Sequence, residues 1–233
     1  MDIATSNILN AAKIRADAFD GEHIEDVEST VNAKADIHKV NVSTVVNNQK
    51  RNAPIGLFDS GVGGLSVYLH LAQQLPAERY IYYADTLNVP YGNRDSADIE
   101  ALTLTAIDWL YEQGCKLIVI ACNSASAYAL ETARRRYPQL PIVGLVPALK
   151  PAISASKSGR VVVLATKATL NGTLLNEVIE HFATPSNTVV TKYFDPQLVP
   201  WVEAGMPKQD DTASRLRQQL TLFAHDGVDQ LVL

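Results

Sequence analysis

The sequence has few cysteines and no long apolar run. Its 233 residues contain two cysteines, Cys115 and Cys122, which excludes a disulfide-rich scaffold and favours a reducing compartment. No apolar stretch approaches the roughly 20 residues of a membrane-spanning helix. The N-terminus lacks the basic flank and apolar core of a secretory signal. We therefore expect a cytoplasmic, globular protein that does not contact a membrane.

Strong positive charge and the common cofactor motifs are also absent. The formal net charge is −5, and no Lys/Arg run interleaves with aromatic residues, so nucleic acid is not an expected partner. No group of His, Cys and Asp has metal-ligand spacing, and neither a P-loop nor a flavin motif is present. The sequence thus predicts no metal and no cofactor.

Residues 1–52 contain few aromatic residues and many polar ones. Phe19 is their one aromatic residue, and eight acids and six bases are scattered through them. This composition predicts a mobile N-terminal extension, with one helical segment around Ile8 to Phe19. The simplest interpretation is a passive tail.

From Pro54 onward the pattern alternates between strands and helices. Residues 53–147 form a predicted first domain with strands at Ile55–Phe58, Arg79–Ala84, Lys116–Ala121 and Pro141–Leu145, and helices near Leu65–Gln74, Ser96–Glu112 and Ser126–Arg136. Residues 148–233 form a second, with strands at Arg160–Ala165, Thr188–Tyr193 and Val228–Leu233, and helices at Leu174–Phe182 and Thr212–His225. The fold class is α/β, with two similar doubly wound parallel-sheet domains.

An internal repeat supports this division. A helix, a glycine turn and a strand precede Cys122, and the same succession recurs in the last residues of the sequence. Superposing Gly114 on Gly227 places Leu233 opposite Ile120. The counterpart of Cys122 would then fall two positions beyond the last residue, so we expect the second domain to be truncated.

Cys122 is the leading candidate for chemistry. It follows a continuous apolar strand and precedes an Ala-rich helix whose candidate N-caps are Asn123, Ser124 and Ser126. Ligands bind at this strand edge in open α/β sheets. A helix N-terminus can lower the pKa of a thiol, which predicts a base or nucleophile. The alternative is a buried core cysteine, which is our interpretation of Cys115 at the other end of the strand.

The first strand leads into a glycine-rich turn that begins with Asp59 and Ser60. Three glycines follow within four residues, so several backbone N–H groups can approach an anion at a helix N-terminus. A carboxylate at the strand end would repel a pyrophosphate, so Asp59 favours a site with a cationic or protonic partner beside the anion. Its structural alternative is an Asx-turn or a helix cap.

Three further candidates are weaker. Pro90, Tyr91 and Gly92 lie in a turn after the second strand and offer a hydroxyl at the same sheet edge. Thr166 and Thr169 follow a strand of the second domain as Asp59 follows the first. Glu203 is a carboxylate in an apolar setting, either an orienting group or a surface salt link.

Taken together, four motifs resemble the glutamate racemase group of the aspartate/glutamate racemase superfamily. They are IGLFDSGVGGLSVY, PYG, IVIACNSASA and VGLVPALKPA, in register over residues 54–233. The resemblance implies two similar α/β domains related by a pseudo-dyad. It also implies cofactor-independent interconversion of L- and D-glutamate, which supplies D-glutamate for peptidoglycan.

The resemblance also implies roles for individual residues. Cys122 would be one of two catalytic thiols, with Asp59 assisting at the same face. The substrate-binding residues would be Asp59, Ser60, Pro90, Tyr91, Gly92, Asn123, Ser124 and Thr166, with Glu203 as an auxiliary group. Ser124 departs from the usual Thr but keeps the hydroxyl. The second thiol belongs to a Gly-Cys-Thr-His motif that this sequence does not contain, so we expect the 233-residue chain to be nearly inactive as a racemase.

Other interpretations stay open. Within the superfamily they are an aspartate racemase and a single-thiol decarboxylase. From another class comes a non-catalytic binding or regulatory protein, because extended family members include enzymes activated by UDP-N-acetylmuramoyl-L-alanine and some linked to inhibition of DNA gyrase. A homodimer is a further expectation.

Overall fold

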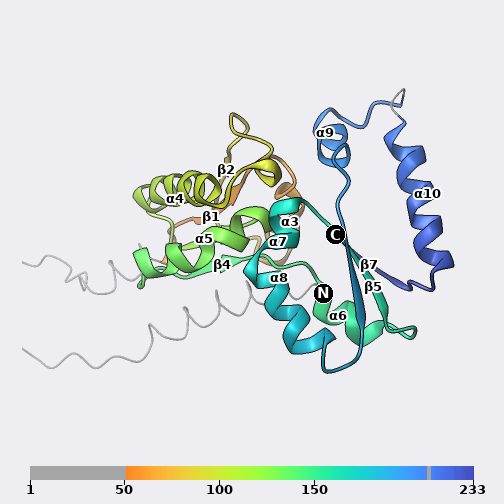
Figure 1. The fold of residues 1–233 in the computed structure, drawn as a ribbon. Helices are drawn as coiled ribbons and strands as arrows, with labels where there is room; N and C mark the ends of the chain where they lie inside the picture. Colours follow the sequence, from red (N-terminus) through yellow and green to blue (C-terminus); the bar gives the residue numbers. More distant parts are fainter. Residues whose placement is uncertain (1–50, 209–210) are drawn as a thin grey trace, which may run out of the picture.

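The computed structural model describes residues 51–208 and 211–233, in which the chain forms two parallel sheets side by side (Figure 1). The predicted helix around Ile8 to Phe19, and all but two residues of the predicted extension, lie outside these ranges. We call the part that carries the first sheet the first half, and the part that carries the second sheet the second half. None of the described helices is long and apolar enough to cross a membrane.

Four parallel strands form the first sheet, in the order β2-β1-β3-β4. They are β1 (Ile55–Asp59), β2 (Tyr80–Ala84), β3 (Leu117–Ile120) and β4 (Ile142–Gly144). The helices of this half are α3 (Leu65–Gln74), α4 (Ser96–Glu112) and α5 (Asn123–Arg136), with a 3₁₀ turn η1 (Tyr91–Asn93). The doubly wound parallel sheet predicted from the sequence is confirmed.

Alternating side chains of β1 and β3 pack on opposite faces of this sheet. Phe58 and Ile118 belong to the core cluster shared with α4 and α5, whereas Leu57 and Val119 belong to the cluster shared with α3. Every residue of these two strands is buried. Such continuous apolar strands are typical of parallel sheets covered by helices on both faces.

The second sheet has three parallel strands in the order β6-β5-β7, the same arrangement as β2-β1-β3 in the first. The strands are β5 (Arg160–Leu164), β6 (Val189–Tyr193) and β7 (Gln230–Val232). The helices are α6 (Leu149–Ala155), α7 (Lys167–Asn171), α8 (Thr173–Val178), α9 (Leu198–Glu203) and α10 (Thr212–His225), with a π-helical turn η2 (Ile179–Ala183). The shared topology agrees with the internal repeat.

Some predicted boundaries are wrong. The predicted segment Leu174–Phe182 is helical throughout, as α8 followed directly by the π-helical turn η2, but α6, α7 and α9 were not predicted. The helix after Cys122 begins at Asn123 rather than at Ser126, so the three predicted N-caps lie inside it. Cys122 itself caps the helix, because its Sγ accepts a hydrogen bond from the Ala125 N–H.

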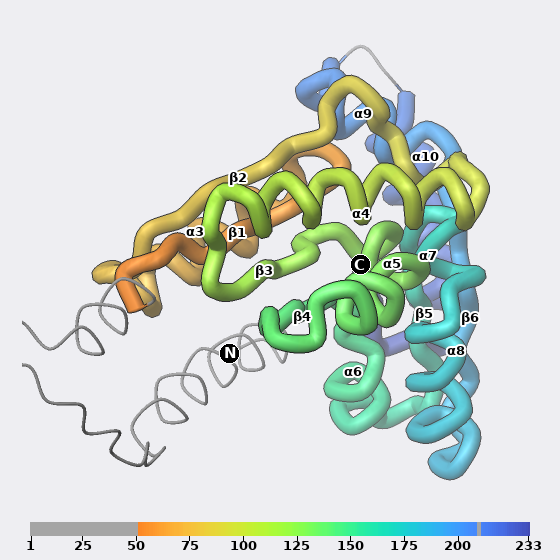
Figure 2. The backbone as a smooth tube through the Cα atoms, turned by 90° about the vertical axis from the view of Figure 1, so that its left-hand side faces the viewer, coloured from red at the N-terminus to blue at the C-terminus, as the bar shows by residue number. Residues whose placement is uncertain are grey.

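The two halves meet along α5 and α7. These helices lie side by side in both views (Figures 1 and 2). A Cβ atom at Gly92 would lie 2.5 Å from the Cβ of Thr166, and one at Gly172 would lie 2.5 Å from the Cβ of Ala127. Backbone and side chain therefore touch at two points across this junction, next to the carboxyl ends of β1 and β3.

Candidate active site

Cys122 lies one residue after Ala121, which follows the last residue of β3, and its side chain is buried. The Sγ is 3.4 Å from the Ser60 Oγ and 3.4 Å from the Ala125 backbone nitrogen. The structure therefore brings together the cysteine and the serine that the sequence predicted as neighbours. The Cys122 Sγ therefore contacts the residue after β1 and the beginning of α5.

The prediction of an acidic thiol is wrong for this environment. Burial raises the pKa of the Cys122 thiol, and the negative charge of Asp59 raises that pKa further. Hydrogen bonds from Ser60 and from the Ala125 N–H act in the opposite direction but are smaller effects. Desolvation disfavours the charged form, and here it outweighs the helix N-terminus.

Asp59 ends β1 and is buried. Its Oδ2 accepts hydrogen bonds from the Gly64 N–H at 2.9 Å and from the Tyr82 hydroxyl at 3.3 Å. The structural alternative considered for Asp59 is thus present, since this carboxylate orders the glycine turn at the beginning of α3. One N–H of the predicted anion site is consequently occupied by Asp59.

Tyr82 and Asp85 are polar residues at this sheet edge that sequence reasoning missed. Burial and the neighbouring Asp59 carboxylate raise the pKa of the Tyr82 hydroxyl, which keeps it a neutral donor. The buried Asp85 directly follows β2. A signal existed for Asp85, because it directly follows a predicted strand, but none for Tyr82, which lies within that strand.

Tyr91 does not present its hydroxyl to the crevice. The side chain is buried, and the hydroxyl donates to the Asp85 Oδ2 at 2.6 Å. Asn88 donates to both oxygens of the same carboxylate. This triad orders the turn that contains Pro90 and Gly92, whose Val89–Pro90 peptide is cis. Tyr91 therefore shapes the loop through Asp85, and its substrate-binding role stays a prediction.

Hydroxyl groups from both halves meet beside Cys122. Ser124 Oγ lies 2.8 Å from Thr166 Oγ1 and 3.3 Å from Thr169 Oγ1. Thr166 also caps α7 by accepting from the Thr169 N–H. The buried Oδ1 of Asn123 has no hydrogen-bond partner among the residues that the structure describes. These groups can bind the polar ends of a small ligand.

Glu203 reaches the glycine turn from the second half. A Cβ atom at Gly61 would lie 2.9 Å from the Glu203 Oε1, so this carboxylate contacts the turn that follows Asp59. Glu203 also contributes to the raised pKa of the Tyr82 hydroxyl. A thiol, two carboxylates and several hydroxyls therefore gather at the carboxyl ends of β1 and β3. Within the described ranges no group of three or more His, Cys, Asp or Glu side chains could hold a metal ion.

The family comparison agrees with this architecture. The model of the Asp/Glu/hydantoin racemase family matches residues 55–233. The chain belongs to this family. Among curated relatives, a glutamate racemase of Deinococcus radiodurans is 51% identical over 180 residues, covering 77% of this chain and 62% of its own. A glutamate racemase of Roseiflexus is 44% identical, with 77% and 65% covered.

Solved structures of family members have the same fold. Escherichia coli glutamate racemase in complex with L-glutamate and the activator UDP-MurNAc-Ala superposes with a TM-score of 0.67 at 33% identity, covering 78% of this chain and 68% of that one. The Francisella tularensis glutamate racemase in complex with D-glutamate gives 0.66 at 29% identity, covering 77% and 67%. The chain therefore spans about two thirds of the length of the proteins it matches.

Proposed function

We propose that this chain is the part of a glutamate racemase that supplies the first catalytic thiol. The reaction interconverts L- and D-glutamate without a cofactor, by proton transfer between the substrate α-carbon and two thiols on opposite faces. The observation that carries the proposal is the buried Cys122 at the carboxyl end of β3, beside Ser60 and the Asp59 carboxylate. The relatives named above are glutamate racemases, and the two solved structures among them are complexes with glutamate.

The raised pKa of Cys122 defines its part in the reaction. A protonated thiol is the form needed to donate a proton to the carbanion intermediate, and the thiolate is the form needed to remove one. When the ammonium group of glutamate enters the crevice, its positive charge opposes the effect of Asp59 on the thiolate. We infer that substrate binding brings the two forms of Cys122 closer in free energy.

Inversion of the α-carbon requires a base on each face. Cys115 is the other cysteine in the 233 residues, and it precedes β3 at the opposite end of that strand, where its Sγ lies 3.0 Å from a Cβ position at Gly56. It cannot reach a ligand beside Cys122. A polypeptide of these residues should therefore exchange the α-proton of one enantiomer with solvent but should not invert it at a useful rate.

Deuterium exchange tests this proposal directly. The 233-residue chain is incubated with L-glutamate or D-glutamate in D₂O, and loss of the α-proton signal is followed by NMR while a chiral assay follows inversion. We expect exchange of one enantiomer without inversion, and its loss in Cys122→Ala. Cys115→Ala is the matched control and should exchange normally. Rapid inversion by the 233 residues, or exchange that survives Cys122→Ala, would contradict the two-thiol mechanism.

Substrate choice belongs to the same proposal. L-aspartate is one methylene shorter, and such a difference is worth about 1–3 kcal/mol in a binding pocket. Comparing the two amino acids in the exchange assay, and by circular dichroism in a protein with both thiols, would separate a glutamate racemase from an aspartate racemase. In the cell, we propose that this activity supplies D-glutamate for peptidoglycan in the cytoplasm.

A second proposed property is activation by UDP-N-acetylmuramoyl-L-alanine. Two adjoining grooves, of about 640 and 510 Å³, share Tyr137, Pro138 and Leu140; the first lies at the amino end of β3 and the second runs along the edge strand β4. Arg134 and Arg136 line the grooves, paired with Glu131 at 3.4 Å and Asp108 at 2.7 Å, and the ring centroids of Tyr111 and Tyr137 lie 4.5 Å apart. Cations suit a diphosphate and aromatic faces suit a uracil ring.

The activator is tested by calorimetry with the nucleotide precursor and UDP as probes. Arg136→Ala should weaken binding of both, because it removes a cation that the diphosphate needs. Binding that is unchanged in this variant would remove the groove from the proposal. A homodimer is the remaining part of the proposal, and sedimentation of the chain with and without the precursor measures it.

A further inference from the structure

Helix α9 occupies an exposed position with little packing to hold it. None of its six residues is buried, although its last residue, Glu203, contacts the glycine turn of the first half. Isolated helices shorter than about 12 residues are marginal in water. The place of Glu203 must therefore be fixed by specific bonds at the ends of α9 rather than by a core.

A buried carboxylate provides such bonds at the beginning of α9. Asp195 follows β6 and is 4% exposed. Its Oδ1 accepts from the N–H of Gln197, the residue that caps α9, at 2.8 Å. At the other end of the helix the Trp201 indole N–H donates to the Pro207 carbonyl at 3.2 Å.

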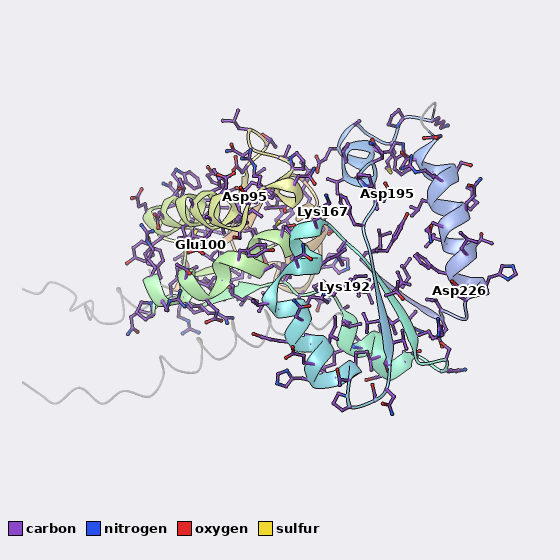
Figure 3. The ribbon with its side chains drawn as sticks, viewed as in Figure 1. Asp95, Glu100, Lys167, Lys192, Asp195 and Asp226 are labelled. Carbon is purple, nitrogen blue, oxygen red and sulfur yellow. The ribbon has the colours of Figure 1, made fainter. Side chains whose placement is uncertain are left out.

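The same carboxylate is paired with α10. Arg215 Nη2 lies 3.1 and 3.3 Å from the two oxygens of Asp195, and its Nη1 lies 3.3 Å from Asp211. Figure 3 shows Asp195 in the space between α9 and α10. Asp195 thus joins the N-terminus of α9 to the first turn of the longer helix α10.

The strength of this connection depends on the negative charge of the buried Asp195. A buried carboxylate is costly unless it is paired, and loss of Arg215, whose own side chain is partly exposed, would leave the buried Asp195 charge uncompensated. If Arg215 is removed, the Asp195 carboxylate lowers its free energy by turning toward water. The Gln197 N–H, which donates to this carboxylate, would then move with it. The position of α9 is therefore coupled to the ion pair.

We propose that the Asp195–Arg215 pair is a positioning device that holds α9, and with it the carboxylate of Glu203, against the glycine turn at Gly61. Asp195 and Arg215 are positioning residues, because they act through Glu203 and touch neither Cys122 nor the hydroxyl cluster around Ser124. The functional part of this inference rests on the proposed racemase chemistry. The structural part, which concerns the place of α9, does not.

Fluorescence of Trp201, which lies in α9, measures whether that helix keeps its place. In the 233-residue chain, Trp109→Phe leaves Trp201 as the one tryptophan, and acrylamide quenching then measures its exposure. Arg215→Met should raise the quenching constant about twofold, because α9 separates from its support. Arg217→Met, the same change two residues along α10, is the matched control and should leave quenching unchanged.

Asp195→Asn separates the ion pair from general damage to the fold. The amide oxygen can still accept from the Gln197 N–H, but the charge that attracts Arg215 is lost. We expect the same increase in quenching as for Arg215→Met, no further increase in the double variant, and recovery in Arg215→Lys. If both Asp195→Asn and Arg215→Met left the quenching of Trp201 unchanged, the inference would be wrong.

Proton exchange reports the functional part. Glu203→Gln and Arg215→Met should each lower kcat for exchange of the glutamate α-proton by about threefold or more, and the double variant should be no slower than Glu203→Gln alone. Additive losses would overturn the inference that Arg215 acts through Glu203. If Glu203→Gln had no effect while Arg215→Met still exposed Trp201, the auxiliary role of Glu203 would fail and the structural role of the pair would stand.

Discussion

The two halves of the molecule share a topology but differ in how deeply their strands are buried. β1 and its counterpart β5 are almost equally buried, and neither β2 nor β6 has a buried residue, but β3 is buried throughout whereas its counterpart β7 has one buried residue. Both Cys122 and Asp59 stand at the ends of fully buried strands. The second half contributes Thr166, which follows the buried strand β5, and Glu203, which ends α9, a helix with no buried residue.

This difference suggests that the two halves have different roles at the candidate site. Groups that exchange protons need fixed geometry and a dry environment, and the first half provides both at Cys122. Groups of the second half can move onto a bound ligand if the elements that carry them are flexible. If the halves differ in this way, they should respond differently to hydrogen exchange, to substitution and to pH.

The largest contrast should appear in backbone hydrogen exchange. Amides of β1 and β3 should exchange only through global unfolding, whereas those of β7, an edge strand with an exposed Leu231, should exchange through local opening. We expect peptides from the two regions to differ by about 10³-fold in protection. Mass spectrometry of pepsin fragments measures this, and equal protection would remove the distinction between the halves.

The next effect comes from the junction between them. Gly92→Ala adds a Cβ only 2.5 Å from the Thr166 Cβ, which lies close to the backbone and cannot move freely. Such overpacking costs about 1–3 kcal/mol, so we expect a lower midpoint of urea unfolding and weaker glutamate binding.

Gly63→Ala is the matched control for stability. The nearest atom to a Cβ at Gly63 is the Asp59 Oδ2 at 3.8 Å, an ordinary contact. A loss of stability in Gly63→Ala as large as that in Gly92→Ala would show that the turns are sensitive in general and that the junction has no special role.

A smaller effect should follow from the hydrogen bond between Tyr91 and Asp85. Tyr91→Phe leaves a buried carboxylate with one donor fewer, which costs about 1.5–3 kcal/mol in comparable cases. We expect the free energy of unfolding to fall by an amount near the lower end of this range, because Asn88 still donates to Asp85. The second consequence is weaker glutamate binding, since the turn holding Gly92 loosens.

Tyr80→Phe is the control for this change. The Tyr80 hydroxyl donates to the Leu71 and Leu75 carbonyls at the end of α3, and it contacts no residue of the crevice. We expect a loss of stability without a change in glutamate binding. If both tyrosine variants bound glutamate equally well, the Tyr91–Asp85 bond would be structural only.

Sequence reasoning predicted the first half better than the second, for a physical reason. Long apolar strands and a seventeen-residue helix give strong periodic signals, and β1, β3 and α4 lie where the pattern placed them. Short helices such as α7 and α9 give almost none. Their existence depends on contacts distant in sequence, such as the bond from Asp195 to Arg215.

The candidate site shows the same limit. Strand ends predicted which residues share an edge, and so Cys122 and Ser60 were expected together. The pKa of Cys122 could not be predicted in this way, because it depends on how burial and the charge of Asp59 balance the helix N-terminus. The fate of the Tyr91 hydroxyl likewise depended on Asp85, which the pattern did not single out.

The smallest predicted effect concerns pH and is confined to the first half, because both cysteines lie there. Burial raises the pKa of Cys115 to about 11. The folded protein thus keeps this proton at pH values where the unfolded chain has lost it. Stability from Cys115 is complete below the pKa of the unfolded thiol and is lost as pH rises toward 11. Between pH 8 and 10 we expect the titration of Cys115 to lower the free energy of unfolding by about 1 kcal/mol.

Urea unfolding of the wild type and of Cys115→Ala at both pH values isolates this contribution. Substitution removes a buried side chain, which lowers stability at either pH, but the difference between pH 8 and 10 should shrink by about 1 kcal/mol. Cys122 and the tyrosines titrate in both proteins and cancel in the comparison. An unchanged pH dependence in Cys115→Ala would mean that the thiol at the base of β3 is reached by water, and that the end of the first sheet opposite the crevice is less closed than its strands.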